Sequence, residues 1–111
     1  MEDTLQADRA AHELGGLLRD HNGKDVVVLD LRKLNTWTDF FIIATVTSHT
    51  HVQGLLRHIK EFAREKDLEI LRRPPKAGPD NEWNLVDLGN IIVHLMSERA
   101  RSFYELERLW A

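Results

Sequence analysis

Two apolar segments, residues 25–31 (DVVVLDL) and 40–46 (FFIIATV), constrain the fold of this chain more than any other feature. Both are short, rich in β-branched or aromatic side chains and mostly apolar, with Asp25, Asp30 and Thr45 as their polar residues, which is typical of strands buried on both faces. They therefore predict central strands of a sheet that helices cover. A length of 111 residues favours a single domain, spanning residues 1–111, with one modest core.

The remaining segments complete an α/β (α+β) pattern. Apolar spacing, Ser and Thr helix caps and a Gly-Asn turn predict the other elements. They are helix 5–19 after Thr4, a helix after Ser48, strand 68–73 before Pro74-Pro75, a hairpin over 83–96 and a helix from Ser97. The helix after Ser48 is expected to connect strand 40–46 to strand 68–73 as a crossover between parallel partners, with Val46 near Leu71. We expect a single mixed sheet of about five strands flanked by helices.

Composition excludes several functional classes. The chain has no cysteine, so disulfides, iron–sulfur clusters and thiol catalysis are excluded, and a reducing cytoplasm is the expected location. Its N-terminus is acidic without an apolar region, and its longest uncharged run, 40–56, contains Thr, Ser and His, so no membrane association is expected. A net charge of −3 does not suit a phosphate-binding surface, so we expect little direct nucleic-acid binding.

The hairpin has two different faces. If Gly89-Asn90 forms a two-residue turn, Leu88 lies opposite Ile91, and one aliphatic face is directed to the core. The other face is mixed, with one acid and one imidazole among large apolar side chains. Its members are Trp83, Leu85, Asp87, Ile92, His94 and Met96.

The mixed face allows more than one interpretation. Asp87 and His94 are diagonal neighbours, so a carboxylate-oriented general base is conceivable. No serine, cysteine or metal-ligating group lies at a suitable spacing, and a surface acid beside a self-satisfied histidine is the simpler interpretation. Trp83 is either an interface anchor or a core residue under the last helix, since Trp is frequent in both settings. We predict no catalytic residue.

Metal and nucleotide chemistry lack their usual motifs. The histidines His49, His51 and His58 have no carboxylate or thiol at ligand spacing, so no metal site is expected. The chain has no Gly-x-Gly-x-x-Gly and no Walker loop. Nucleotidyl transfer requires a Gly-Ser loop that is followed by an acid-x-acid pair on a strand. The chain has no Gly-Ser pair, and its acid-x-acid pairs are expected at a junction, in a loop and on the last helix. We expect neither a cofactor nor an enzyme.

Four stretches resemble the ribosomal silencing factor family (RsfS, also called Iojap). They are VVVLDLRKLNTWTDFFIIAT at 26–45, W-x-x-x-D-L-G at 83–89, IIVHLM at 91–96 and R-x-F-Y-E-L-E-R-L-W at 101–110. Together they cover the chain in order from about Asp25 to Trp110, and the last two form a specific combination.

The resemblance implies a nucleotidyltransferase-like fold that has lost catalysis. It implies a translational repressor that binds the large ribosomal subunit through a protein at the subunit interface, the universal large-subunit protein fourteen. Occupying that surface would sterically block joining of the small subunit. The residues that match the family's partner-facing region are Trp83, Asp87, Leu88, His94 and Met96. With Leu85, which the hairpin pattern places beside Trp83, they are the six residues predicted to bind the partner. Asp39, Arg101, Tyr104 and Glu107 match motif positions that are either functional or structural.

Two segments depart from the family pattern, and two alternative functions remain. Ala44-Thr45-Val46-Thr47-Ser48 lacks the glycine that the family carries at the end of the second strand, and Arg73-Pro74-Pro75-Lys76 replaces a Glu-Gly pair. The alternatives are a residual nucleotidyltransferase-like enzyme using Asp87 and His94, and a homodimerising domain whose apolar face pairs with a second copy.

Overall fold

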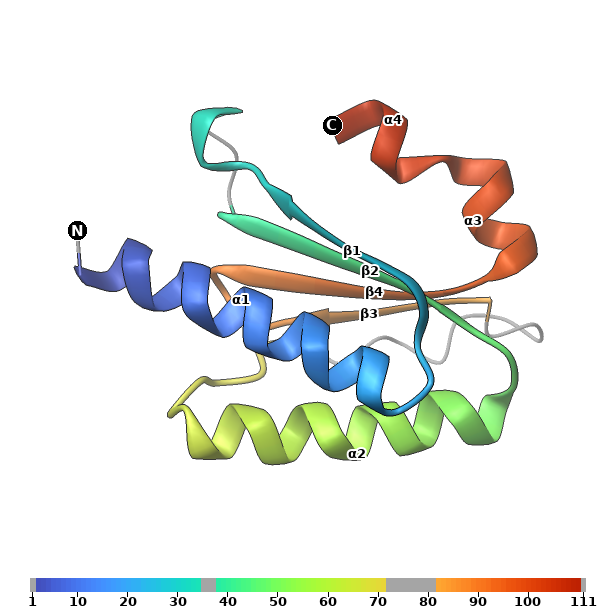
Figure 1. The fold of residues 1–111 in the computed structure, drawn as a ribbon, viewed down its shortest axis with the longest axis horizontal. Helices are drawn as coiled ribbons and strands as arrows, with labels where there is room; N and C mark the ends of the chain where they lie inside the picture. The colour runs from blue at the N-terminus through green and yellow to red at the C-terminus, as the bar shows by residue number, and fades with distance from the viewer. Residues whose placement is uncertain (1, 35–37, 72–81, 111) are drawn as a thin grey trace.

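The computed structural model describes residues 2–34, 38–71 and 82–110. In this part of the chain, four strands form one mixed sheet in the order β1-β2-β4-β3, visible in Figure 1. The pair β1·β2 is antiparallel, β2·β4 is parallel and β3·β4 is antiparallel. The strands are β1 Lys24–Asp30, β2 Phe40–Val46, β3 Trp83–Asp87 and β4 Ile91–Ser97.

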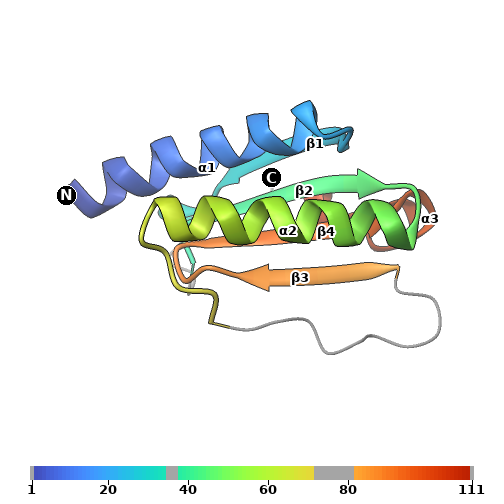
Figure 2. The same cartoon turned by 90° about the horizontal axis from the view of Figure 1, so that it is seen from below.

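Helices cover both faces of this sheet. The long helices α1 (Glu2–Asp20) and α2 (His49–Glu65) pack side by side against one face, as Figures 1 and 2 show. The short helices α3 (Glu98–Tyr104) and α4 (Leu106–Trp110) follow β4 directly and pack on the other face. The expected α/β architecture of a single sheet between helices is confirmed.

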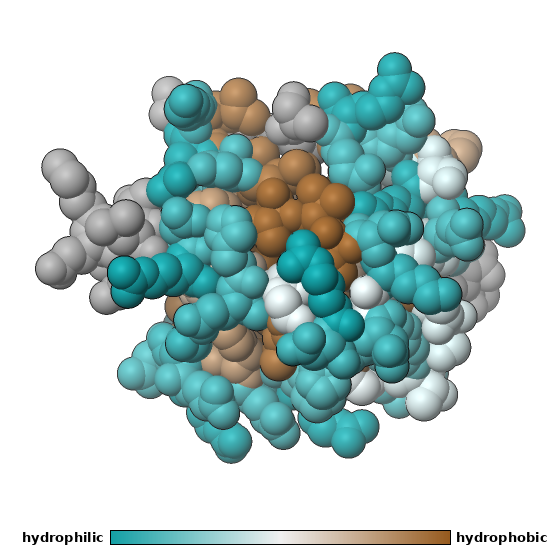
Figure 3. All heavy atoms as spheres, viewed as in Figure 1, coloured by the Kyte–Doolittle hydropathy of each residue, from teal (hydrophilic) through white to brown (hydrophobic). Residues whose placement is uncertain are grey.

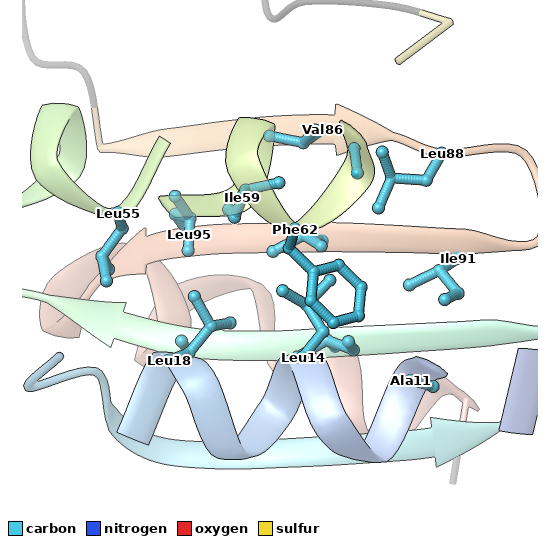
Figure 4. Close-up of a cluster of buried hydrophobic side chains, with 14 of the residues drawn as sticks. Ala11, Leu14, Leu18, Leu55, Ile59, Phe62, Val86, Leu88, Ile91 and Leu95 are labelled. Carbon is cyan, nitrogen blue, oxygen red and sulfur yellow. The ribbon is translucent and has the colours of Figure 1, made fainter. Parts of the chain in front are cut away.

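The main core lies between the sheet and the two long helices. Leu14 and Leu18 of α1 meet Ile59 of α2 over the strands, and all three are fully buried (Figure 4). Alternation along β2 sends Phe40, Ile42 and Ala44 to this core and leaves the intervening residues to the other face. Because β2 contributes to both cores, every residue of the strand is buried, as the apolar run predicts.

The hairpin has the predicted register. Val86 pairs with Val93 and Asn84 with Leu95, while the Leu88 amide donates to the Ile91 carbonyl at 2.9 Å. At the turn, Gly89 adopts a φ of 87°, in the left-handed region that favours glycine. The aliphatic face therefore belongs to the main core and the mixed face to the opposite side.

The serine caps are confirmed, whereas α1 begins earlier than predicted. The Ser48 hydroxyl accepts from the His51 amide at 3.1 Å, and the Ser97 hydroxyl accepts from the Ala100 amide at 3.0 Å. Helix α1 already begins at Glu2, so Thr4 lies inside it and is not its cap.

The prediction of a strand over 68–73 is wrong for its described part. Residues 68–71 form no strand, and residues 72–73 lie outside the described residues. The Leu71 amide donates one hydrogen bond, of 2.8 Å, to the Asp87 carbonyl beside the edge of β3. The predicted partner position next to Val46 is occupied by β4. After α2 the chain enters the sheet as the edge strand β3, which is antiparallel to β4, and the described part of the sheet has four strands.

Two further predictions are corrected. The sequence predicts a central strand over residues 25–31, but β1 lies at the edge of the sheet that the described residues form, where β2 is its one partner, and residues 26–29 are half-buried. Apolar atoms accordingly reach the surface over β1, near the middle of the face in Figure 3. The last helix is also not continuous, because Glu105 adopts a left-handed conformation (φ 47°) and separates α3 from α4.

Candidate protein-docking site

The six residues predicted to bind a partner lie at three different depths. Trp83, Leu85 and Asp87 alternate along β3 and are half-buried on the mixed face. His94 and Met96 lie on the same face in β4 but are buried, Met96 beneath the C-terminal helices. Leu88 is buried in the main core on the opposite face, where Figure 4 shows its side chain among the aliphatic residues.

Trp83 and His94 form the polar centre of the mixed face. Trp83 pairs with Met96 and Leu85 with His94, so Trp83 and His94 are diagonal neighbours across the two strands. The Trp83 indole N–H donates to His94 Nδ1 at 3.0 Å, with the ring centroids 5.9 Å apart. On its other side, the imidazole makes an edge-to-face contact with Phe41, at 4.5 Å between centroids. The indole is therefore held by both a hydrogen bond and packing.

Burial determines the charge of His94. Its side chain is 3% exposed, and desolvation lowers its pKa from 6.5 to about 4. The ring is therefore neutral at neutral pH and carries one proton. Because Nδ1 accepts from the indole, that proton sits on Nε2. Nε2 is buried and has no hydrogen-bond partner among the described residues.

Asp87 shapes the hairpin turn and does not orient His94. Its Oδ1 accepts from the Gly89 amide at 2.8 Å, a local bond typical of Asp at turns. No hydrogen bond joins Asp87 to His94 within the described part of the chain, and His94 Nδ1 is already occupied by Trp83. The arrangement required for the hypothesis of a general base oriented by Asp87 is not formed.

Aromatic side chains of α3 extend Trp83 into a larger surface. The Tyr104 ring lies 4.7 Å from Trp83 and 5.0 Å from Phe103, between ring centroids. Phe103 is 79% exposed and Tyr104 47% exposed, unusually high values for large rings. We call Trp83, Phe103 and Tyr104 the aromatic surface. The sequence analysis identified Tyr104 only as a motif residue and did not single out Phe103, because nothing in the sequence of the expected last helix indicates that its ring is exposed.

Arg101 fixes the helices that carry this surface. Its Nε donates to Glu107 Oε1 at 2.5 Å, and its Nη1 donates to the Thr45 hydroxyl at 2.9 Å and to the Lys24 carbonyl at 3.4 Å. One guanidinium thus joins α3, α4 and the two strands β1 and β2. The motif residues Arg101 and Glu107 therefore have a structural role in positioning Phe103 and Tyr104.

Other features of the described residues do not add chemistry to this face. Among these residues, no three or more His, Cys, Asp or Glu side chains are arranged to hold a metal ion. No described helix has the length and apolar character that a membrane span needs. A cleft of about 650 Å³ lies on the opposite side of the sheet, between α1, the end of α2 and the hairpin turn.

Comparisons with known proteins agree on one family. A family model described as "Ribosomal silencing factor during starvation" matches residues 4–111. The ribosomal silencing factor RsfS of Treponema pallidum is 37% identical over 106 residues, covering 96% of this chain and 94% of that protein. A mouse protein named "Mitochondrial assembly of ribosomal large subunit protein 1" is 31% identical over 98 residues, 87% of this chain and 43% of its own.

A solved structure extends the match to the fold. A crystal structure of a Chromobacterium violaceum protein superposes with a TM-score of 0.78 and 31% identity, covering 96% of this chain and 84% of that one. Sequence and fold thus agree over nearly the whole length, as the resemblance of the four motif stretches predicted. The chain belongs to the ribosomal silencing factor family.

Proposed function

We propose that this protein represses translation by binding the large ribosomal subunit through the universal large-subunit protein fourteen, which blocks joining of the small subunit. It acts by occupying a surface, without catalysis, as a protein of the cytoplasm. The aromatic surface, together with the half-buried Leu85 and Asp87, forms the docking site. His94, Met96 and Leu88 support that site from below and do not touch the partner.

The exposed aromatic surface is the observation that carries this proposal. Trp and Tyr are frequent hot spots of protein interfaces, and Phe103 gains most from burial because 79% of it is exposed. Relatives named ribosomal silencing factors, and one named for assembly of the large ribosomal subunit, support a ribosomal partner. A net charge of −3 favours a basic ribosomal protein as the contact and disfavours bare RNA.

The direct test is sedimentation of purified ribosomal subunits through a sucrose gradient, with and without the protein. The protein is expected to travel with the large subunit and to reduce the peak of joined ribosomes. If it stays at the top of the gradient while the subunits join normally, the proposed function is wrong.

Substitutions in the aromatic surface test the docking site. Trp83→Ala is expected to weaken large-subunit binding by about 2 kcal/mol or more, as truncation of a hot spot does. Phe103→Ala should weaken it too, with little cost to the fold, because the ring is largely exposed. The matched control is Leu56→Ala on α2, which loses packing against the core on the far side of the sheet.

The control separates docking from folding. Leu56→Ala should bind the large subunit normally even if its unfolding midpoint falls. Normal binding by both Trp83→Ala and Phe103→Ala would contradict the proposed site. If Phe103→Ala instead lowers the mass measured by light scattering and leaves ribosome binding intact, the aromatic surface pairs with a second copy of the chain.

A further inference from the structure

We propose that His94 is a positioning residue: its Nδ1 fixes the Trp83 indole in the orientation that the docking partner needs. This inference depends on the proposed function, because it assigns a role within the same site. It differs from the expectation that His94 itself contacts the partner, since the side chain is 3% exposed and lies beneath the surface.

Among the described residues, the His94 side chain makes one hydrogen bond, with Trp83. The indole N–H is the only hydrogen-bond donor of the Trp83 side chain, and it points inward to His94 Nδ1 at 3.0 Å. With that bond made, the six-membered ring and edge of the indole are left to pack against Tyr104 and to meet a partner. Phe41 contacts the imidazole in an edge-to-face pair and so fixes the acceptor in turn.

The unpartnered nitrogen argues against a purely structural role. A buried N–H without a partner destabilises a fold, and Nε2 has no partner among the described residues. A leucine at position 94 would fill similar space beside Phe41 without that cost. Of the two ring nitrogens, only Nδ1 makes a hydrogen bond among the described residues, and that bond is with Trp83. The imidazole is therefore the less stable choice at a position where it orients an interface residue.

Two substitutions at position 94 separate orientation from stability. His94→Leu removes the acceptor and also the unpartnered N–H of the imidazole, and the half-buried indole is then free to turn its own N–H toward solvent. His94→Asn keeps an acceptor, because the Asn side-chain oxygen is attached at the same distance along the chain as Nδ1, but it leaves a smaller side chain in the core. Trp83→Phe provides the reciprocal change, since it retains a ring and removes the indole N–H.

Each of the two position-94 variants should lower a different quantity: His94→Leu should lower binding, and His94→Asn should lower stability. His94→Leu is expected to unfold at the same or a higher urea concentration and to bind the large subunit roughly five- to tenfold more weakly, the effect of losing one neutral hydrogen bond. His94→Asn should unfold at a lower urea concentration and bind within about twofold of the original protein. A residue needed only for packing would give the reverse order.

The isolated protein supplies a readout that does not depend on ribosomes. The indole ¹H–¹⁵N resonance of Trp83, assigned by its loss in Trp83→Phe, should shift in His94→Leu and stay close to its original position in His94→Asn. Trp83→Phe should weaken binding at least as much as His94→Leu, because it also removes part of the ring that meets the partner. The double variant should bind no more weakly than Trp83→Phe alone, because both changes remove the same hydrogen bond.

The outcomes distinguish this inference from the proposed function. If Trp83→Ala abolishes binding but His94→Leu binds normally, the positioning role is wrong and the docking site stands. The role is equally overturned if His94→Leu leaves the indole resonance unmoved. If Trp83→Ala itself binds normally, the positioning role is also wrong, because the indole then does not contribute to binding, and the docking site is contradicted as well if Phe103→Ala binds normally.

Discussion

The Arg101 side chain should stabilise the fold far more than its neighbour Arg108, although both pair with a glutamate of the same C-terminal region. Arg101 is 11% exposed and its partner Glu107 is 37% exposed. Arg108 is 79% exposed and its partner Glu105 is 51% exposed, at 3.3 Å. The chemistry of the two pairs is the same, so burial and additional hydrogen bonds decide the difference.

The magnitude follows from the contacts that each substitution removes. Arg101→Met keeps an unbranched apolar side chain and loses the ion pair with Glu107 and the hydrogen bond to the buried Thr45 hydroxyl. Hydrogen bonds of charged groups contribute about 1.5–3 kcal/mol, and Glu107 can be partly rehydrated, so we expect a loss of about 2–3 kcal/mol. An exposed pair contributes about 0–1 kcal/mol, so Arg108→Met should cost about 0.5 kcal/mol or less.

Urea unfolding followed by far-UV circular dichroism measures both losses. For a domain of this size, a slope of about 1–3 kcal/mol per molar urea places the Arg101→Met midpoint roughly 0.7–3 M lower. Arg108→Met should move the midpoint by a few tenths of that. Equal shifts in the two variants would refute the reasoning, because burial of Arg101 would then contribute nothing. Since Arg101 also holds the helices that carry Phe103, its variant should bind the large subunit more weakly in the same gradient assay.

Two further predictions concern α1 and pH. A Cβ added to Gly15 would lie 2.9 Å from the stiff Val28 side chain, whereas a Cβ added to Gly16 would have no described atom within 4 Å. Gly16→Ala should therefore stabilise the protein by about 0.5–1 kcal/mol, and Gly15→Ala should destabilise it. Thermal melts that rank the two variants in the other order would contradict this. Burial lowers the folded-state pKa of His94 to about 4, so between pH 6.5 and pH 4 the unfolded chain binds a proton at His94 that the folded protein does not bind. The free energy of unfolding should therefore fall by about 3 kcal/mol as the pH drops from 6.5 to 4. That decline should be smaller in His94→Leu, and an unchanged slope in urea titrations at several pH values would show that His94 is protonated in the folded state.

The sequence predicts those parts of the fold whose determinants are local. The Gly89-Asn90 turn specifies the register of the hairpin, and with it the two faces. By contrast, an apolar run such as residues 25–31 does not reveal whether a strand is central or at an edge, because β1 and β2 have similar patterns. The position of β4 beside β2 depends on long-range pairing, so the crossover partner was predicted wrongly.

The candidate site depends still more on tertiary contacts. Sequence alternation placed Trp83 and His94 on one face, but the hydrogen bond between them depends on side-chain rotamers that no spacing specifies. The exposure of Phe103 and the left-handed conformation of Glu105 also have no signal in the sequence, since a residue other than glycine rarely adopts a positive φ. The helix break and the diagonal bond are therefore observations that required the structure.

Trp83 should contribute more to the free energy of docking than Phe103, because its side chain is already held in place before the partner binds. Immobilising a side chain on binding costs about 0.5–1.5 kcal/mol, and that cost offsets the gain from burying it. Trp83 is already held by His94 Nδ1 and by Tyr104, on a strand whose register is determined by β4. Among the described residues, Phe103 has one ring contact, with Tyr104, and its ring is mostly exposed. Trp83 therefore enters the interface with little further loss of freedom, so its truncation should weaken binding more than that of Phe103.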